Sequence, residues 1–231
     1  MAVILAGGLG TRLRSVVFDV PKPMANVLGR PFLEYLMDYW IAQGVSKFIV
    51  SVGYKRELII AHFANSYRGI TVTYVEETHP LGTGGGMLLA SQNLKTPFLL
   101  LNGDSFFKVE LHKLIEFHKN KDSDWTLSLF RTNESDRYGG VEIDQNSQIH
   151  TFRSVKSDTN ALANGGVYYI NPKVLSNSNF ISGNSYSLEV DIVPKLIEKK
   201  RKFFGMEIDA QFIDIGVPKD YLEAQSLLKL S

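Results

Sequence analysis

The chain has 231 residues, 44% of them hydrophobic and 21% charged, which suits one sizeable α/β domain. Its formal net charge of +1 argues against nucleic acid or a membrane surface as a partner, because such partners need a clear excess of basic residues. The chain has no cysteine and no apolar run near the ~20 residues of a membrane span, so it lacks disulfides and cysteine nucleophiles, and we expect it in the cytoplasm.

The first predicted element is a short buried strand over residues 2–5, which leads directly into a loop with three glycines in four positions. Glycine has no Cβ to keep a phosphate away, and its freedom in φ lets successive backbone N–H groups point toward one anion. Thr11 adds a hydroxyl, and Arg12 and Lys22 add two cations, which completes a candidate phosphate site. The residues predicted to bind nucleotide here are Leu5, Ala6, Gly7, Gly8, Gly10, Thr11 and Arg12.

This loop differs from two common phosphate loops. The chain has no P-loop string, and Leu13 stands where a dinucleotide fingerprint needs its third glycine. The string from Gly7 to Leu13, followed by Pro21-Lys22-Pro23, resembles instead the signature of the sugar-nucleotide pyrophosphorylases. These are nucleotidyltransferases that join a nucleoside triphosphate to a sugar 1-phosphate. The resemblance implies a Rossmann-like, mixed but mainly parallel sheet flanked by helices, of the glycosyltransferase-A-like type, with a small β-rich sugar-binding region.

Helices and strands are expected to alternate after the loop. Helical spacing predicts an amphipathic helix over 32–41, an apolar run predicts a buried parallel strand over 47–52, and a second helix is expected over 58–63. Tyr54 follows the carboxyl end of the strand predicted over 47–52. Ligands of open α/β sheets collect at the carboxyl ends of strands, so Tyr54 either lines a nucleotide pocket or belongs to a surface turn.

A third strand, over 71–75, leads into a second glycine-rich loop, which is expected to open a helix at 87–91. In the resembled family the matching loop packs against base and ribose, which assigns Gly82 and Thr83 to the nucleotide; a purely structural loop is the alternative. Glu77 lies near the position where relatives that read thymine carry glutamine. A carboxylate there can accept both the ring N–H and the amino group of guanine, although it does not exclude uracil or thymine.

The apolar run 98–101 predicts a central strand whose carboxyl end presents Asn102, Gly103 and Asp104 to the crevice outside the sheet. The resemblance implies that all three bind nucleotide and that Asp104 holds a magnesium ion, a hard cation that prefers oxygen ligands. A helix N-cap is the alternative role for Asp104. Asp214 is expected at a later strand end as the second carboxylate on the metal, with a turn aspartate before glycine as its alternative.

The second part of the chain has a different pattern of predicted elements. After a strand over 125–130, short strands separated by Asn, Ser and Asp turns are predicted over 139–143, 148–152 and 165–170. This part resembles the sugar-binding region of the family. We therefore expect one domain over residues 1–231, with a nucleotide-binding half over 1–130 and a sugar-binding half with a C-terminal helix over 131–231.

Two motifs of this half resemble family motifs that contact the sugar. In the string Asn164-Gly165-Gly166-Val167-Tyr168, Gly165 stands where alanine is usual, and Asn164 either binds sugar hydroxyls or serves as a turn residue. Glu189 is read as a hydroxyl acceptor, with a helix-start acid as the alternative. The residues predicted to bind the sugar phosphate are Lys22, Gly140, Asn164, Glu189 and Asp214. The family's Glu-Lys-Pro is absent, and whether Arg153 or Lys156 replaces its lysine stays open.

The resemblance covers residues 2–228 and implies a magnesium-dependent reaction with Arg12, Lys22 and Asp104 as catalytic residues. Within the family the chain looks most like guanylyltransferases that act on D-glycero-α-D-manno-heptose 1-phosphate, so GTP and this sugar phosphate are the expected substrates. A uridylyl- or thymidylyltransferase and a non-catalytic sugar-nucleotide-binding regulatory subunit remain alternatives, and a homodimer stays open. His112 and His118 lie on one amphipathic segment without a third metal ligand, and we expect both at the surface.

Overall fold

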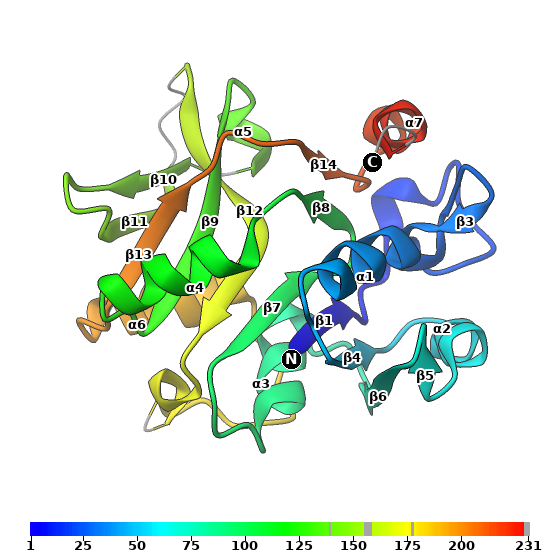
Figure 1. Cartoon of the computed structure of the whole chain (residues 1–231), viewed down its shortest axis with the longest axis horizontal. Helices are drawn as coiled ribbons and strands as arrows, with labels where there is room; N and C mark the ends of the chain where they lie inside the picture. The colour runs from blue at the N-terminus through cyan, green and yellow to red at the C-terminus, as the bar shows by residue number, and fades with distance from the viewer. Residues whose placement is uncertain (139, 155–158, 177, 229–231) are drawn as a thin grey trace.

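The computed structural model describes residues 1–138, 140–154, 159–176 and 178–228 (Figure 1). Its helices are α1 (Phe32–Ala42), α2 (Arg56–Phe63), α3 (Gly82–Ser91), α4 (Leu111–Asn120), α5 (Ser135–Tyr138), α6 (Val193–Glu198) and α7 (Pro218–Leu227). Its strands are β1 (Ala2–Ala6), β2 (Asn26–Val27), β3 (Arg30–Pro31), β4 (Lys47–Val52), β5 (Ser66–Tyr67), β6 (Ile70–Glu76), β7 (Phe98–Asn102), β8 (Ser105–Phe107), β9 (Trp125–Thr132), β10 (Gly140–Ile143), β11 (Ile149–Ser154), β12 (Ala161–Ile170), β13 (Phe203–Glu207) and β14 (Phe212–Asp214).

Within the described residues, ten of these strands form one mixed sheet, in which β1 lies between β7 and β4 and is parallel to both. The neighbouring β4 and β6 are also parallel, whereas the long β12 pairs antiparallel with β7 and β9. Because β1 and β7 are parallel neighbours, the glycine loop and the Asn102–Asp104 segment leave the sheet at the same edge. The pairing of β7 with β12 also joins the two predicted halves in a single sheet.

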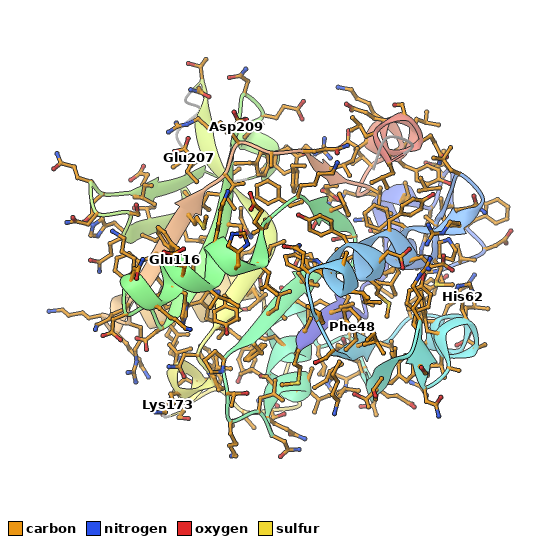
Figure 2. All side chains as sticks on the ribbon, in the orientation of Figure 1. Phe48, His62, Glu116, Lys173, Glu207 and Asp209 are labelled. Atoms are coloured by element: carbon orange, nitrogen blue, oxygen red, sulfur yellow. The ribbon has the colours of Figure 1, made fainter. Side chains whose placement is uncertain are left out.

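Helices cover both faces of the sheet, and alternate residues of β1 show how. Ile4 packs on one face with side chains of α1 and α4, whereas Val3 packs on the other with α3 and α6. Phe48 of β4, labelled in Figure 2, belongs to the first of these layers and is fully buried. A strand that is apolar on both faces suits this sandwiched position. The predicted Rossmann-like, mainly parallel sheet flanked by helices is therefore confirmed.

The largest difference from the expected boundaries concerns α3, although several other elements also begin or end at other residues than expected. The helix expected over 87–91 begins at Gly82, so the glycines of the second loop form its first turns. The N–H groups of Gly84 and Gly85 in the first turn donate to Tyr186 O, a tertiary contact that outweighs the poor helix propensity of glycine. Glycine is needed at these positions, because a Cβ on Gly84 would lie 3.0 Å from the Tyr186 carbonyl oxygen and one on Gly86 would lie 3.1 Å from Ser51 Oγ.

His118 is not at the surface as expected, since only 6% of it is exposed. Its Nδ1 lies 2.9 Å from Thr126 Oγ1 on β9, and its ring meets Tyr169 edge to face. By contrast, His112 on the same helix leaves 72% of its side chain exposed. Within the described residues, none of the helices combines the length and apolar character needed to cross a bilayer.

The buried His118 predicts a pH dependence of stability. Burial lowers the pKa of His118 below its ordinary value of 6.5, and the opposing charges of Asp124 and Asp122 do not restore it. The unfolded chain then binds the proton more tightly, so this contribution to the free energy of unfolding is present above pH ~6.5 and is lost as the pH falls.

We therefore expect His118→Gln to flatten the loss of stability between pH 7 and pH 5, as measured by urea unfolding at each pH. The exposed His112→Gln is the matched control, and its pH slope should equal that of the wild type. An unchanged slope in His118→Gln would show that His118 is not held in its neutral form.

Candidate active site

A cavity of about 630 Å³ opens at the edge of the sheet where β1 and β7 end. It lies between the glycine loop, the N-terminal end of α3 and residues of the sugar half. Sixteen of the predicted site residues line it: Leu5, Ala6, Gly7, Gly8, Gly10, Thr11, Arg12, Lys22, Glu77, Gly82, Thr83, Asn102, Asp104, Asn164, Glu189 and Asp214. The structure thus brings together residues that lie more than 200 positions apart in the sequence.

Three predicted site residues do not line this cavity. Gly103 donates its backbone N–H to Leu5 O at 2.9 Å, and a Cβ there would come within 2.6 Å of the same oxygen. Gly140 is buried in β10, and Tyr54 stands under the Arg14 guanidinium in a small adjoining hollow. Gly103 therefore allows the ends of β7 and β1 to approach closely, and contact of Tyr54 or Gly140 with a substrate stays a prediction.

The glycine loop has the shape of an anion cradle. Gly10 adopts a left-handed φ of 59° and leads into a short 3₁₀ turn over Thr11–Leu13, which carries Arg12 on its exposed side. At Gly7, a Cβ would lie well inside van der Waals contact with the Glu77 carboxylate, so this position accepts no side chain. Gly8 has open space around it. The backbone N–H groups of the loop can therefore be approached by phosphate.

Lys22 is held between two carboxylates at the floor of the cavity. Its Nζ lies 2.5 Å from Asp104 Oδ2 and 3.7 Å from Asp214 Oδ1, and only 9% of its side chain is exposed. Burial, and next the negative charge of Asp104, raise the pKa of Asp214 even though Lys22 and the Gly216 N–H act in the opposite direction. Two close carboxylates of this kind favour a cation between them.

These two carboxylates also fit a magnesium ion. Magnesium is commonly bound by one or two protein carboxylates, with phosphates and water as the remaining ligands. In the described part of the chain, no group of three acidic, histidine or cysteine side chains gathers that could hold a metal by itself. Asp104 and Asp214 therefore suit a metal that binds together with a phosphate substrate.

Glu77 forms one wall of the cavity and is 8% exposed. Its Oε1 accepts a hydrogen bond from Ser51 Oγ at 2.9 Å, and its Oε2 accepts one from the Leu81 N–H at 3.2 Å. Each carboxylate oxygen has a second acceptor site. The carboxylate is therefore fixed in orientation by the protein and still has acceptor capacity for a ligand.

Three hydrogen bonds join the start of α3, in the nucleotide half, to residues 186–188 of the sugar half. The N–H groups of Gly84 and Gly85 donate to Tyr186 O at 2.8 and 3.1 Å, and Thr83 Oγ1 accepts from the Leu188 N–H at 2.9 Å. The helical turn Leu188–Ile192, which carries Glu189, begins at this junction. The start of α3 thus holds Glu189 at the wall of the cavity.

Asn164 lies on β12 at the far side of the cavity. Its Nδ2 donates to Tyr168 OH at 2.6 Å, and its Oδ1 accepts from the Gly166 N–H at 3.2 Å. The amide is thus oriented by two neighbours of its own strand, as a turn residue would be, while it still lines the cavity. Binding of a sugar hydroxyl by Asn164 stays a prediction.

The space around Gly165 predicts that a larger residue at this position would destabilise the fold. The resembled family usually has alanine here. A Cβ at this position would overlap the buried Phe107 ring and lie 3.1 Å from Ser128 O. We expect Gly165→Ala to lower the free energy of unfolding by about 1–3 kcal/mol, as overpacking does, measured by urea unfolding. Gly8→Ala is the control, because nothing lies within 4 Å of its added Cβ. Equal stability of the two variants would contradict this packing.

Arg137 and Tyr138 also line the cavity, although no motif in the sequence had marked them as site residues. Arg137 extends from α5 toward two carboxylates, those of Asp220 and Asp214. The sequence offered one signal for Arg137, which is its place directly before the segment in which short strands are predicted. Lys156 and the side chain of Arg153, left open as replacements for the family lysine, lie outside the described residues.

Comparison with known proteins gives concordant matches over the whole chain. A family model described as "Nucleotidyl transferase" matches residues 1–230. The chain is 41% identical over 229 residues to D-glycero-alpha-D-manno-heptose 1-phosphate guanylyltransferase of Aneurinibacillus thermoaerophilus, covering 99% of this chain and 98% of that protein. It is 38% identical over 220 residues to the enzyme of the same name from Campylobacter jejuni, covering 95% and 96%.

Solved structures agree with these matches. The crystal structure of HddC from Yersinia pseudotuberculosis superposes with a TM-score of 0.86 at 35% identity, over 100% of this chain and 99% of that one. The same protein complexed with GMP-PN gives a TM-score of 0.84 at 34% identity, over the same shares of the two chains.

Proposed function

Since the chain belongs to the nucleotidyl transferase family, we propose that it transfers GMP from GTP to D-glycero-α-D-manno-heptose 1-phosphate and releases pyrophosphate. The observation that carries the proposal is one cavity in which the anion cradle, the cations Arg12 and Lys22 and the carboxylates of Asp104 and Asp214 lie beside sugar-side residues. The substrates are those named for the two relatives, which match this chain over almost their full length.

In the proposed reaction, a phosphate oxygen of the sugar 1-phosphate attacks the α-phosphorus of GTP. A new P–O bond forms as the bond between the α-phosphorus and the bridging oxygen breaks, and pyrophosphate leaves with the electron pair. The attacking group is already an anion at neutral pH, so no general base is required. The obstacles are alignment and repulsion between two polyanions, which phosphoryl transfer enzymes overcome by positioning and by cations.

The residues at the floor of the cavity meet these obstacles. Arg12, on the exposed side of the 3₁₀ turn, binds the β- and γ-phosphates and stabilises the leaving pyrophosphate. Lys22, buried beside Asp104, neutralises charge between the attacking and α-phosphates. The family commonly uses a divalent metal, and we assign magnesium to Asp104 and Asp214. When bound there, magnesium supplies charge neutralisation at the phosphates.

Glu77 is the proposed guanine-reading residue. Its carboxylate is fixed by Ser51 and the Leu81 N–H, so its remaining acceptor sites can take the ring N–H and amino group of guanine together. We expect Glu77→Gln to raise the KM for GTP by roughly 10- to 200-fold, because an amide replaces one of the two acceptors by a donor. Steady-state kinetics with GTP as the varied substrate measures this.

The Glu77→Gln variant also has an internal control. The KM for the sugar 1-phosphate should stay within about twofold of the wild-type value, since Glu77 contacts the nucleotide side only. Thr78→Val, next in sequence and outside the cavity lining, is the matched variant that should leave both constants unchanged. Equal KM values for GTP in the wild type and in Glu77→Gln would remove Glu77 from base recognition.

The experiment for the function as a whole is pyrophosphate release with magnesium. GTP, UTP, dTTP, CTP and ATP are tested against D-glycero-α-D-manno-heptose 1-phosphate and mannose 1-phosphate. Turnover confined to GTP with the heptose phosphate is the expected result. Turnover with UTP or dTTP would overturn the substrate assignment, and nucleotide binding without any turnover would identify a regulatory protein.

A further inference from the structure

Arg137 is the one cavity-lining cation of the described residues that the reaction above does not use. Arg12 and Lys22 come from the nucleotide half, beside the glycine loop. Arg137 comes instead from α5 of the sugar half and shares the cavity wall with Asn164 and Glu189. Its position therefore suits the second substrate rather than GTP.

The Arg137 guanidinium is fixed by contacts on several sides. Its Nη2 is paired with Asp220 Oδ2, its Nη1 lies 3.3 Å from Glu134 Oε2, and its Cζ lies 4.6 Å from the centre of the Tyr138 ring. Asp220 is only 6% exposed and stands in the first turn of α7. A buried carboxylate is costly unless a cation pairs with it, so Asp220 and Arg137 keep each other in place.

The two oxygens of Asp214 face two different cations. Asp214 Oδ1 lies 3.7 Å from Lys22 Nζ, and Asp214 Oδ2 lies 3.7 Å from Arg137 Nη2. Lys22 and Arg137 thus flank the carboxylate assigned to the metal. A phosphate that binds beside Asp214 would meet a cation from each half of the chain.

Arg137 also has donors left for a ligand, because each Nη carries two N–H groups and the pairs with Glu134 and Asp220 use one of each. Its Nε has no hydrogen-bond partner among the described residues but is buried, so a ligand in the cavity would be met by the Nη groups. A guanidinium with unused N–H groups is the side chain best suited to bidentate binding of a phosphate through two parallel N–H···O bonds.

On the basis of the proposed function, we propose that Arg137 binds the phosphate of the sugar 1-phosphate and that Asp220 is a positioning residue for it. Lys22 then holds the same phosphate from the nucleotide side.

The test compares two KM values in Arg137→Gln. The KM for D-glycero-α-D-manno-heptose 1-phosphate should rise at least about tenfold, while the KM for GTP stays within about twofold. Arg137→Lys, which keeps the charge but not the fork, should recover part of the loss. Asp220→Asn should raise the KM for the same substrate by a smaller factor. Arg131→Gln, which breaks an arginine–carboxylate pair with Glu207 outside the cavity lining, should change neither value.

Calorimetric binding of a non-hydrolysable GTP analogue reports whether each variant is folded. If Arg137→Gln is unfolded because Asp220 is left buried without its partner, the Arg137→Gln/Asp220→Asn double variant removes both charges and takes its place. An active wild type with an unchanged sugar-phosphate KM in the folded variant would overturn the role of Arg137 alone. A wild type inactive with every nucleotide and sugar phosphate would overturn the proposed function, and this inference with it.

Discussion

Replacing Lys22 by methionine is expected to lower kcat for nucleotidyl transfer about a hundredfold or more, measured as pyrophosphate release at saturating substrates. The reason is the position of Lys22, whose Nζ lies 2.5 Å from Asp104 and 3.7 Å from Asp214 at the cavity floor. Removing one preorganised donor from a developing charge costs about 3 kcal/mol of transition-state stabilisation. Methionine keeps much of the side-chain volume, so the loss of charge dominates the result.

Lys113→Met is the control for this variant. Lys113 also pairs with a carboxylate, that of Glu110, but 55% of its side chain is exposed and it lies on α4 outside the cavity lining. Its kcat should equal that of the wild type. A Lys22→Met enzyme that keeps more than about a tenth of the wild-type kcat would contradict the catalytic role of Lys22.

Replacing Asp104 by asparagine is expected to have the largest effect, roughly a thousandfold loss of kcat, because it removes one of two carboxylates assigned to the metal. The direct readout is titration with Mn²⁺, followed by electron paramagnetic resonance, with a non-hydrolysable GTP analogue present. We expect at least about a tenfold weaker Mn²⁺ affinity in the variant.

The control for Asp104→Asn is Asp122→Asn, which neutralises an exposed aspartate that pairs with Lys202 and lies outside the cavity lining. It should bind Mn²⁺ as the wild type does. Wild-type Mn²⁺ affinity in Asp104→Asn would show that the metal is held elsewhere, even if the activity were lost.

The parts of the site that follow buried strands could be predicted from sequence. An apolar run that ends in glycines, as at Gly7, or in an acid, as at Asp104, places those residues at the carboxyl edge of a parallel sheet. The observed register of β1 and β7 agrees, with Leu5 opposite Asn102. The resemblance to nucleotidyltransferases, based on the glycine loop and the later motifs, is confirmed by the family match over residues 1–230.

The parts that the sequence did not reveal depend on contacts between distant segments. Arg137 and Asp220 pair across 83 positions, and neither residue has a local pattern that predicts the other. The start of α3 at Gly82 depends on the close approach of the Tyr186 backbone, about a hundred residues later, which leaves no room for a Cβ on Gly82. His118 is buried because Thr126 and Tyr169 surround it, whereas helical spacing alone does not distinguish it from the exposed His112.

Nucleotidyl transfer to a sugar is tested most directly by identifying the products with ³¹P NMR and mass spectrometry after incubation with GTP, magnesium and D-glycero-α-D-manno-heptose 1-phosphate. We expect a GDP-linked heptose and pyrophosphate in equal amounts, with no product when the sugar phosphate is omitted. Pyrophosphate with free GMP, or GDP with inorganic phosphate, would show transfer to water and would contradict nucleotidyl transfer to a sugar.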